Sequence, residues 1–135
     1  MVAAISWSGG KDGWLALLRA RAAGHDVRYA LTMFDESGER SRSHAVPPDL
    51  MALQLRALGL EAVSARAPWP RYEEALIAAL RDLAARGVET VVFGDIDIAA
   101  HLAFEERVCA AAGLTALLPL WQQRRAALVE EMARH

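Results

Sequence analysis

The feature that most constrains the fold is an alternation of short apolar runs and amphipathic helical patterns along all 135 residues. Expected strands cover residues 3–7, 27–34, 62–65, 90–93 and 115–118, and expected helices cover residues 12–23, 48–58, 72–86, 99–112 and 122–133. The first four helices each end at a glycine, namely Gly24, Gly59, Gly87 and Gly113. Strands separated by helices of this length form βαβ units, so the sequence predicts an α/β fold with a parallel sheet.

The expected arrangement is a doubly wound parallel sheet of strand order 3-2-1-4-5 in three α/β/α layers. In this order the first and fourth strands are neighbours, and the chain reverses its direction of travel between them. Ligands bind at the carboxyl ends of the strands at such a switch point. The loops after the first and fourth strands are therefore predicted to meet in one crevice.

The loop after the first strand carries the sequence Ser8, Gly9, Gly10, Lys11, Asp12 and Gly13. Adjacent glycines let backbone N–H groups approach an anion, and the next helix directs its positive end to the same place. Lys11 adds a compact positive charge. We predict a phosphate site here, with an ordinary Gly-Gly turn as the alternative.

Two common nucleotide-binding loops are excluded by this sequence. Asp12 stands where a Walker A loop needs Ser or Thr, and no G-x-G-x-x-G is present.

A second group of polar residues follows the fourth strand. Gly94 leaves room for a substrate or adenosine, and Asp95 and Asp97 are placed to hold Mg²⁺ facing the phosphates. His101 and Glu105 are four residues apart and share a helix face. Asp97, His101 and Glu105 can be imagined as a transition-metal site, but a capping aspartate and a solvated helix face explain the same residues.

The polar segment at residues 35–43 follows the second strand and is long for a small domain. Arg40 and Arg42, with His44 just beyond, suit contacts to phosphate. We expect the segment to fold over bound ATP. The alternative is a solvated connection with incidental charge.

Composition excludes several classes of protein. The single cysteine, Cys109, rules out an internal disulfide and a cysteine-based zinc site, and is expected to be a buried filler. A formal net charge of −2 gives no electrostatic case for nucleic-acid binding. The sequence shows no signal peptide and no membrane-length apolar stretch, so a cytoplasmic protein is expected.

The loop at residues 8–13 resembles the PP-loop, S-G-G-x-D-S, of the ATP pyrophosphatases, with Gly13 in place of the last Ser. Two later blocks resemble one branch of that superfamily, the diphthine–ammonia ligases, also called adenine nucleotide alpha hydrolase proteins. These blocks are His44-Ala45-Val46-Pro47 with Leu53-Gln54 and Ala57-Leu58-Gly59, then Phe93-Gly94-Asp95-Ile96 with His101, Glu105-Glu106-Arg107-Val108-Cys109 and Pro119-Leu120-Trp121.

The resemblance implies a HUP-type Rossmann-like fold and ATP-dependent amidation. ATP would adenylate a carboxylate acceptor, pyrophosphate would leave, and ammonia would displace AMP, with Mg²⁺ as cofactor. The residues that would border the nucleotide are Ser8, Gly9, Gly10, Lys11, Asp12, Gly13, Arg42, His44 and Gly94. Lys11, Asp12 and Asp95 would be catalytic, while His101 and Glu105 match family positions without an assigned role.

Two departures from the family pattern keep other readings open. Gly13 lacks the last hydroxyl of the loop, and family members continue past the Pro-Leu-Trp block into a segment that serves the acceptor. The chain is expected to be a single ATP-binding domain over residues 1–135, with a homodimer as one option. The alternatives are a non-catalytic nucleotide-binding or regulatory module, and a nucleotide half that a partner completes. Modification of tRNA by adenylation fits the loop but neither the charge nor the absent zinc-ligand cysteines.

Overall fold

The computed structural model describes residues 2–7, 11–34, 48–123 and 125–133, in which strands and helices alternate as predicted. The strands are β1 (Val2–Ser6), β2 (Asp26–Phe34), β3 (Glu61–Arg66), β4 (Val88–Val92) and β5 (Thr115–Leu117). The helices are α1 (Lys11–Ala22), α2 (Pro48–Ala57), α3 (Tyr72–Ala85), α4 (Ala99–Ala112) and α5 (Arg125–Ala133), with a short 3-10 turn, η1 (Trp69–Arg71), before α3.

The five strands form one parallel sheet of order β3-β2-β1-β4-β5, which confirms the predicted topology. β1 pairs with β2 on one side and with β4 on the other, so that Ile5 lies opposite both Ala30 and Val92. Ala3, Ala4 and Ile5 are fully buried, as expected of a central strand covered on both faces. The carboxyl ends of β1 and β4 are therefore neighbours.

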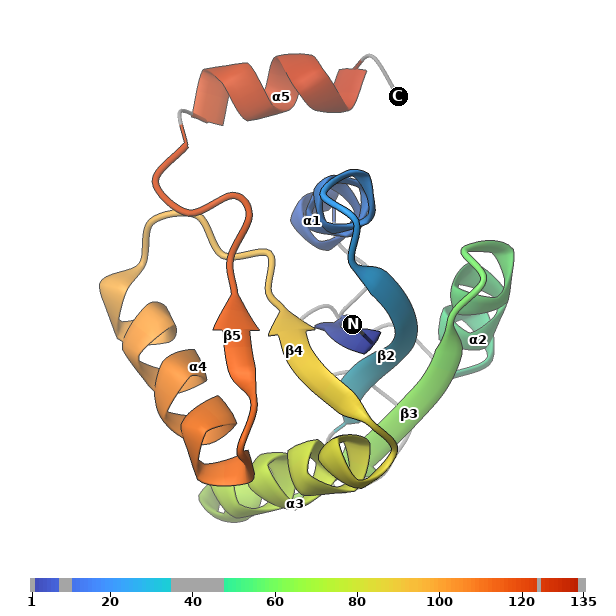
Figure 1. Cartoon of the computed structure of the whole chain (residues 1–135), viewed down its shortest axis with the longest axis vertical. Helices are drawn as coiled ribbons and strands as arrows, with labels where there is room; N and C mark the ends of the chain where they lie inside the picture. Colours follow the sequence, from blue (N-terminus) through green and yellow to red (C-terminus); the bar gives the residue numbers. More distant parts are fainter. Residues whose placement is uncertain (1, 8–10, 35–47, 124, 134–135) are drawn as a thin grey trace.

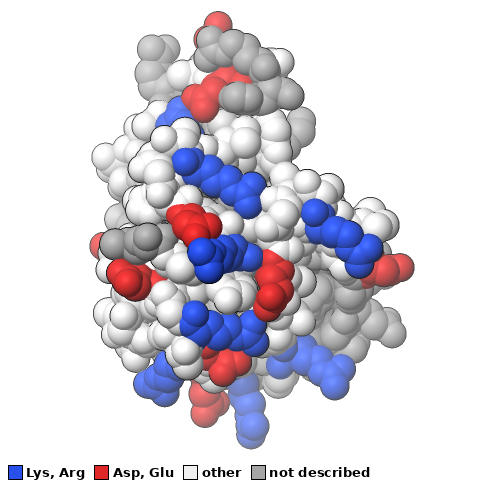
Figure 2. Space-filling view, turned by 45° about the vertical axis from the view of Figure 1, so that its right-hand side comes forward, with Lys and Arg blue, Asp and Glu red and all other residues white. Residues whose placement is uncertain are grey.

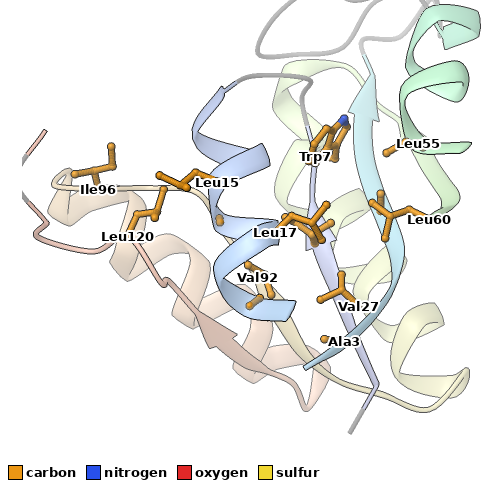
Figure 3. Close-up of a cluster of buried hydrophobic side chains, with 14 of the residues drawn as sticks. Ala3, Trp7, Leu15, Leu17, Val27, Leu55, Leu60, Val92, Ile96 and Leu120 are labelled. Carbon is orange, nitrogen blue, oxygen red and sulfur yellow. The ribbon is translucent and has the colours of Figure 1, made fainter. Parts of the chain in front are cut away.

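Helices cover both faces of the sheet (Figure 1). One apolar cluster joins the sheet to α1, α2 and α5, and ten of its side chains are labelled in Figure 3. The other cluster joins the opposite face to α3 and α4. On α3 the buried side chains are Leu76, Leu80 and Leu83, which belong to the stripe that the helical spacing predicts.

The last described helix, α5, packs beside α1. Leu128 of α5 is almost completely buried in the cluster on the α1 face. Arg19 of α1 binds Glu131 of α5, with its Nε 3.1 Å from one carboxylate oxygen and a terminal nitrogen bonded to the other. The hydrogen bond with Glu131 raises the pKa of Arg19, although the arginine's partial burial acts against it. This two-point contact anchors α5 to the helix that follows the glycine loop.

Two element boundaries differ from the predicted ones by two or more residues, and the others agree within one residue. The last helix begins at Arg125, and not at residue 122, because Gln122 has a φ of 59°, a left-handed conformation that a right-handed helix excludes. The N–H of Gln122 donates to the carbonyl oxygen of Ile96 at 2.5 Å. β4 begins two residues before the predicted strand because Val88 pairs with Val2 of β1.

The surface carries charges of both signs. On the face shown in Figure 2, basic and acidic side chains are interspersed, without an extended patch of one sign. Within the described part of the chain, no helix has both the length and the apolar character needed to cross a membrane.

Candidate nucleotide site

The carboxyl end of β1 is fixed to β2 immediately before the glycine loop. The N–H of Trp7 donates to Leu31, and its carbonyl oxygen accepts a bond from the hydroxyl of Thr32, both at 2.8 Å. The buried indole ring of Trp7 packs against the start of α1, since a Cβ on Gly13 would lie 3.7 Å from it. The first turn of α1 is thus set directly above the switch point between β1 and β4.

The loop after β4 touches this first turn of α1. A Cβ on Gly94 would lie 3.0 Å from both the carbonyl carbon of Asp12 and the backbone nitrogen of Gly13. This distance is tighter than nine in ten real Cβ contacts, and the neighbouring atoms are backbone, so a side chain here would require the backbone to shift. The two motifs, some eighty residues apart in sequence, therefore meet as predicted. Gly94 makes room for the protein's own backbone, and its approach to adenosine stays a prediction.

Asp95 lies at the carboxyl end of β4 and is held by two residues of α4. Nδ1 of His101 lies 3.0 Å from Oδ1 of Asp95 and donates to it. Glu105, one turn further along α4, makes a second side-chain hydrogen bond to the same carboxylate. His101 is about half exposed, the Asp95 side chain is 25% exposed and Glu105 is buried. The structure therefore brings three of the predicted site residues into one cluster.

The two carboxyl groups of this cluster differ in protonation at neutral pH: one is neutral and the other is negatively charged. Burial, and then the hydrogen bond with Asp95 and its negative charge, raise the pKa of Glu105 to about 10. Burial by itself would raise the pKa of Asp95 too, but the hydrogen bonds from Glu105 and His101 outweigh it and lower that pKa below its usual value. Glu105 is therefore the protonated donor and Asp95 the ionised acceptor.

These contacts correct two expectations for α4. Glu105 is not on a solvated helix face, because Val108 and Cys109 continue the buried stripe to which it belongs. The residue at the cap position of α4 is Ile98, which makes no side-chain capping bond, so no aspartate occupies that position. Asp97 is exposed, and no group of three His, Cys, Asp or Glu residues suited to a metal ion occurs among the residues described.

The expected magnesium role of Asp95 stays a prediction. Its carboxylate is bonded to side chains of α4, which covers the opposite face of the sheet from α1. A single carboxylate can serve Mg²⁺ when the substrate phosphates supply the other ligands.

Cys109 is the small buried filler that the sequence predicts. It is fully buried on the α4 side of the sheet. Burial, with a smaller contribution from Glu105, raises the pKa of its thiol to about 12. A thiol that stays protonated at neutral pH is not a nucleophile.

Several predicted site residues lie outside the described part of the chain. They are Ser8, Gly9, Gly10, Arg42 and His44, together with the whole polar segment at residues 35–43. Lys11 begins α1, but only its backbone is described, while Asp12 is exposed in the first turn.

The sequence reasoning missed the part that Trp7 plays at this site, and it missed the burial of Glu105. Trp7 packs against the loop helix, and its buried Nε1 has no hydrogen-bond partner among the described residues. Its place directly before the loop is the signal that could have found it. The burial of Glu105 could have been read from its spacing of three and four residues before Val108 and Cys109.

Comparison with known families agrees with this geometry. The family model described as "Diphthamide synthase N-terminal domain" matches residues 1–116. The chain belongs to this family. It is a PP-loop protein similar to the diphthine–ammonia ligases, as its motifs predict.

A solved structure supports the fold. The predicted subunit of a tRNA methyltransferase from Methanocaldococcus jannaschii is similar with a TM-score of 0.66 and 15% sequence identity. The match covers 98% of this chain and 76% of that one. At this identity the likeness concerns the fold alone, which is Rossmann-like. A comparison with functionally curated proteins found no match.

Proposed function

We propose that this chain binds ATP with its phosphates at the N-terminus of α1 and splits it into AMP and pyrophosphate to activate a carboxylate. The observation that carries the proposal is the backbone contact of Gly94 with Asp12 and Gly13. This contact lies in the first turn of α1, at the switch point between β1 and β4, where α/β sheets bind ligands.

Each residue around the N-terminus of α1 is proposed to have its own role in binding the ATP phosphates. The first backbone N–H groups of α1, which have no partner within the helix, are donors for phosphate oxygens. Lys11 is proposed to balance negative charge on the phosphates, and Asp12 and Gly13 to shape the turn. Ser8, Gly9 and Gly10 complete the cradle, with Arg42 and His44 approaching from the segment after β2. Mg²⁺ is proposed to enter bound to the ATP phosphates.

The proposed reaction is amide formation. A carboxylate oxygen of the acceptor attacks the α-phosphorus of ATP, and the bond to pyrophosphate breaks. Ammonia then attacks the acyl carbon of the adenylate, AMP leaves with the bonding electrons, and the ammonia nitrogen loses a proton to solvent or a base. The acceptor is proposed only as a carboxylate.

The alternative is a module that binds adenine nucleotide without splitting it, alone or with a partner that completes the site. Gly13 favours it, because the PP-loop pattern has a hydroxyl there. Space does not prevent that hydroxyl, since a Cβ on Gly13 would make ordinary contacts with Trp7.

Pyrophosphate release separates the two functions. The protein is incubated with MgATP, ammonium and a panel of carboxylate acceptors, and Gly13→Ser is measured beside the wild type. Release by the wild type that depends on an acceptor supports the ligase. ATP binding without release from either protein supports the module, and no ATP binding at all contradicts both.

A further inference from the structure

We propose that Glu105 is a positioning residue for the nucleotide site: its carboxyl group holds Asp95, and through Asp95 it keeps the loop after β4 in contact with the first turn of α1. The inference rests on the proposed function for its effect on ATP. Its structural part, the hold on the loop, does not depend on ATP: Glu105 is buried one helical turn after His101, whose Nδ1 lies 3.0 Å from Oδ1 of Asp95.

The first step is the grip on Asp95. Two donors from one helix, His101 and Glu105, converge on a single carboxylate. They lie one turn apart on α4, so together they fix both the position and the orientation of the carboxylate. The exposed His101 bond competes with water, whereas the Glu105 bond is buried and is the stronger constraint.

The second step leads from Asp95 to the loop helix. Residue 94 is pressed against the backbone of α1, and the carbonyl oxygen of Ile96 accepts the N–H of Gln122 at 2.5 Å. Asp95 lies between these two contacts. The segment 94–96 is therefore held by α1, by α4 and by the turn before α5. Removal of the Glu105 bond leaves the side chain of its middle residue, Asp95, with only the exposed bond from His101 out of these two.

The third step concerns the free-energy cost of burying the carboxyl group of Glu105. An apolar side chain would fill this place without penalty, as its neighbour Val108 does. A carboxyl group loses its hydration here, and Oε1 of Glu105 is buried without a hydrogen-bond partner among the described residues. Residues that break a packing rule at a cost concentrate at functional sites. The bond to Asp95, beside the proposed phosphate site, is the compensation that the structure offers.

The test compares four proteins: the wild type, Glu105→Gln, Glu105→Leu and Val108→Ala. Glutamine keeps a donor for Asp95, leucine fills the space without one, and Val108→Ala weakens the same helix without contacting Asp95. Circular dichroism first establishes that each variant is folded. MgATP affinity is then measured by calorimetry, and amide hydrogen exchange is measured across residues 94–96 and the first turn of α1.

We expect Glu105→Gln and Val108→Ala to bind MgATP within about twofold of the wild type, and Glu105→Leu to lose about tenfold in affinity, as the loss of one buried charged hydrogen bond predicts. Exchange across residues 94–96 should rise in Glu105→Leu alone. Equal exchange in Glu105→Leu and Val108→Ala would overturn the proposal. If the wild type does not bind ATP, the proposed function fails while the exchange result still decides the role of Glu105.

Discussion

Replacement of Glu105 by glutamine is expected to stabilise the fold at neutral and alkaline pH. In the folded protein Glu105 keeps its proton up to a pKa of about 10, whereas in the unfolded chain it ionises near 4.5. A group whose pKa is raised by folding adds most to the free energy of unfolding when the pH is below its pKa in the unfolded chain. This stabilisation is lost as the pH rises towards the pKa in the folded protein. Between these values the stability falls by about 1.4 kcal/mol for each pH unit.

The size of the gain follows from this linkage. At pH 7 the wild type has lost about 3 kcal/mol relative to pH 4.5, because the unfolded state releases the proton that the folded state must keep. Glutamine donates to Asp95 without this loss, but its second N–H enters a buried place that has no known acceptor. We therefore expect a net gain of about 1–3 kcal/mol at pH 7.

The titration of Asp95 does not interfere with the pH dependence expected from Glu105. Its pKa is lowered in the folded protein, so its contribution is present above its unfolded value of 3.8 and is lost only as the pH falls below that value. The linkage of Glu105 operates between about pH 5 and 10. The pH ranges in which the two groups affect stability are therefore separate.

The assay is urea unfolding followed by circular dichroism at pH 5, 7 and 9. The stability difference between Glu105→Gln and wild type should grow steadily over this series. The control is Glu106→Gln, which makes the same residue change at the exposed neighbouring position and should change stability by no more than about 0.5 kcal/mol. A constant difference across the three pH values would refute the claim that Glu105 is protonated in the fold.

Three further changes test other contacts. Gly94→Ala should cost about 1–3 kcal/mol in urea unfolding, because its Cβ would collide with the backbone of Asp12; an unchanged midpoint would contradict the close approach. Gln122→Gly should add about 0.5–1 kcal/mol by relieving a left-handed residue, and a loss of stability would show that the side chain matters more than the backbone. Glu131→Gln should cost about 1 kcal/mol and raise exchange in α5, since it weakens the partly buried pair with Arg19; exchange equal to that of the wild type would refute the anchor.

The sheet was predictable because its sequence signals are local and repeated. Apolar runs such as residues 3–5 are too short for helices, and glycines with positive φ end four helices at Gly24, Gly59, Gly87 and Gly113. The strand order then followed from the alternation and from the position of the loop. The start of α5 did not, because the left-handed backbone of Gln122 leaves no mark in its residue type.

The candidate site was predictable only in part. The sequence identified Gly94 and Asp95 and the convergence of their loop with Asp12 and Gly13, since topology brings these segments together. It could not show that the neighbour of Gly94 is protein backbone, or that Glu105 reaches Asp95. Charged residues on helices are mostly exposed. Only the packing of α4 against the sheet makes Glu105 a buried acid.

The most direct test of the central claim is a titration of ¹⁵N-labelled protein with MgATP, followed by two-dimensional NMR. The account predicts saturable shifts of the backbone amides of Lys11, Asp12 and Gly13 in the first turn of α1 and of Gly94, with the amides of the distant β3 edge unchanged. Absence of any shift, or shifts confined to residues away from the carboxyl ends of β1 and β4, would contradict it.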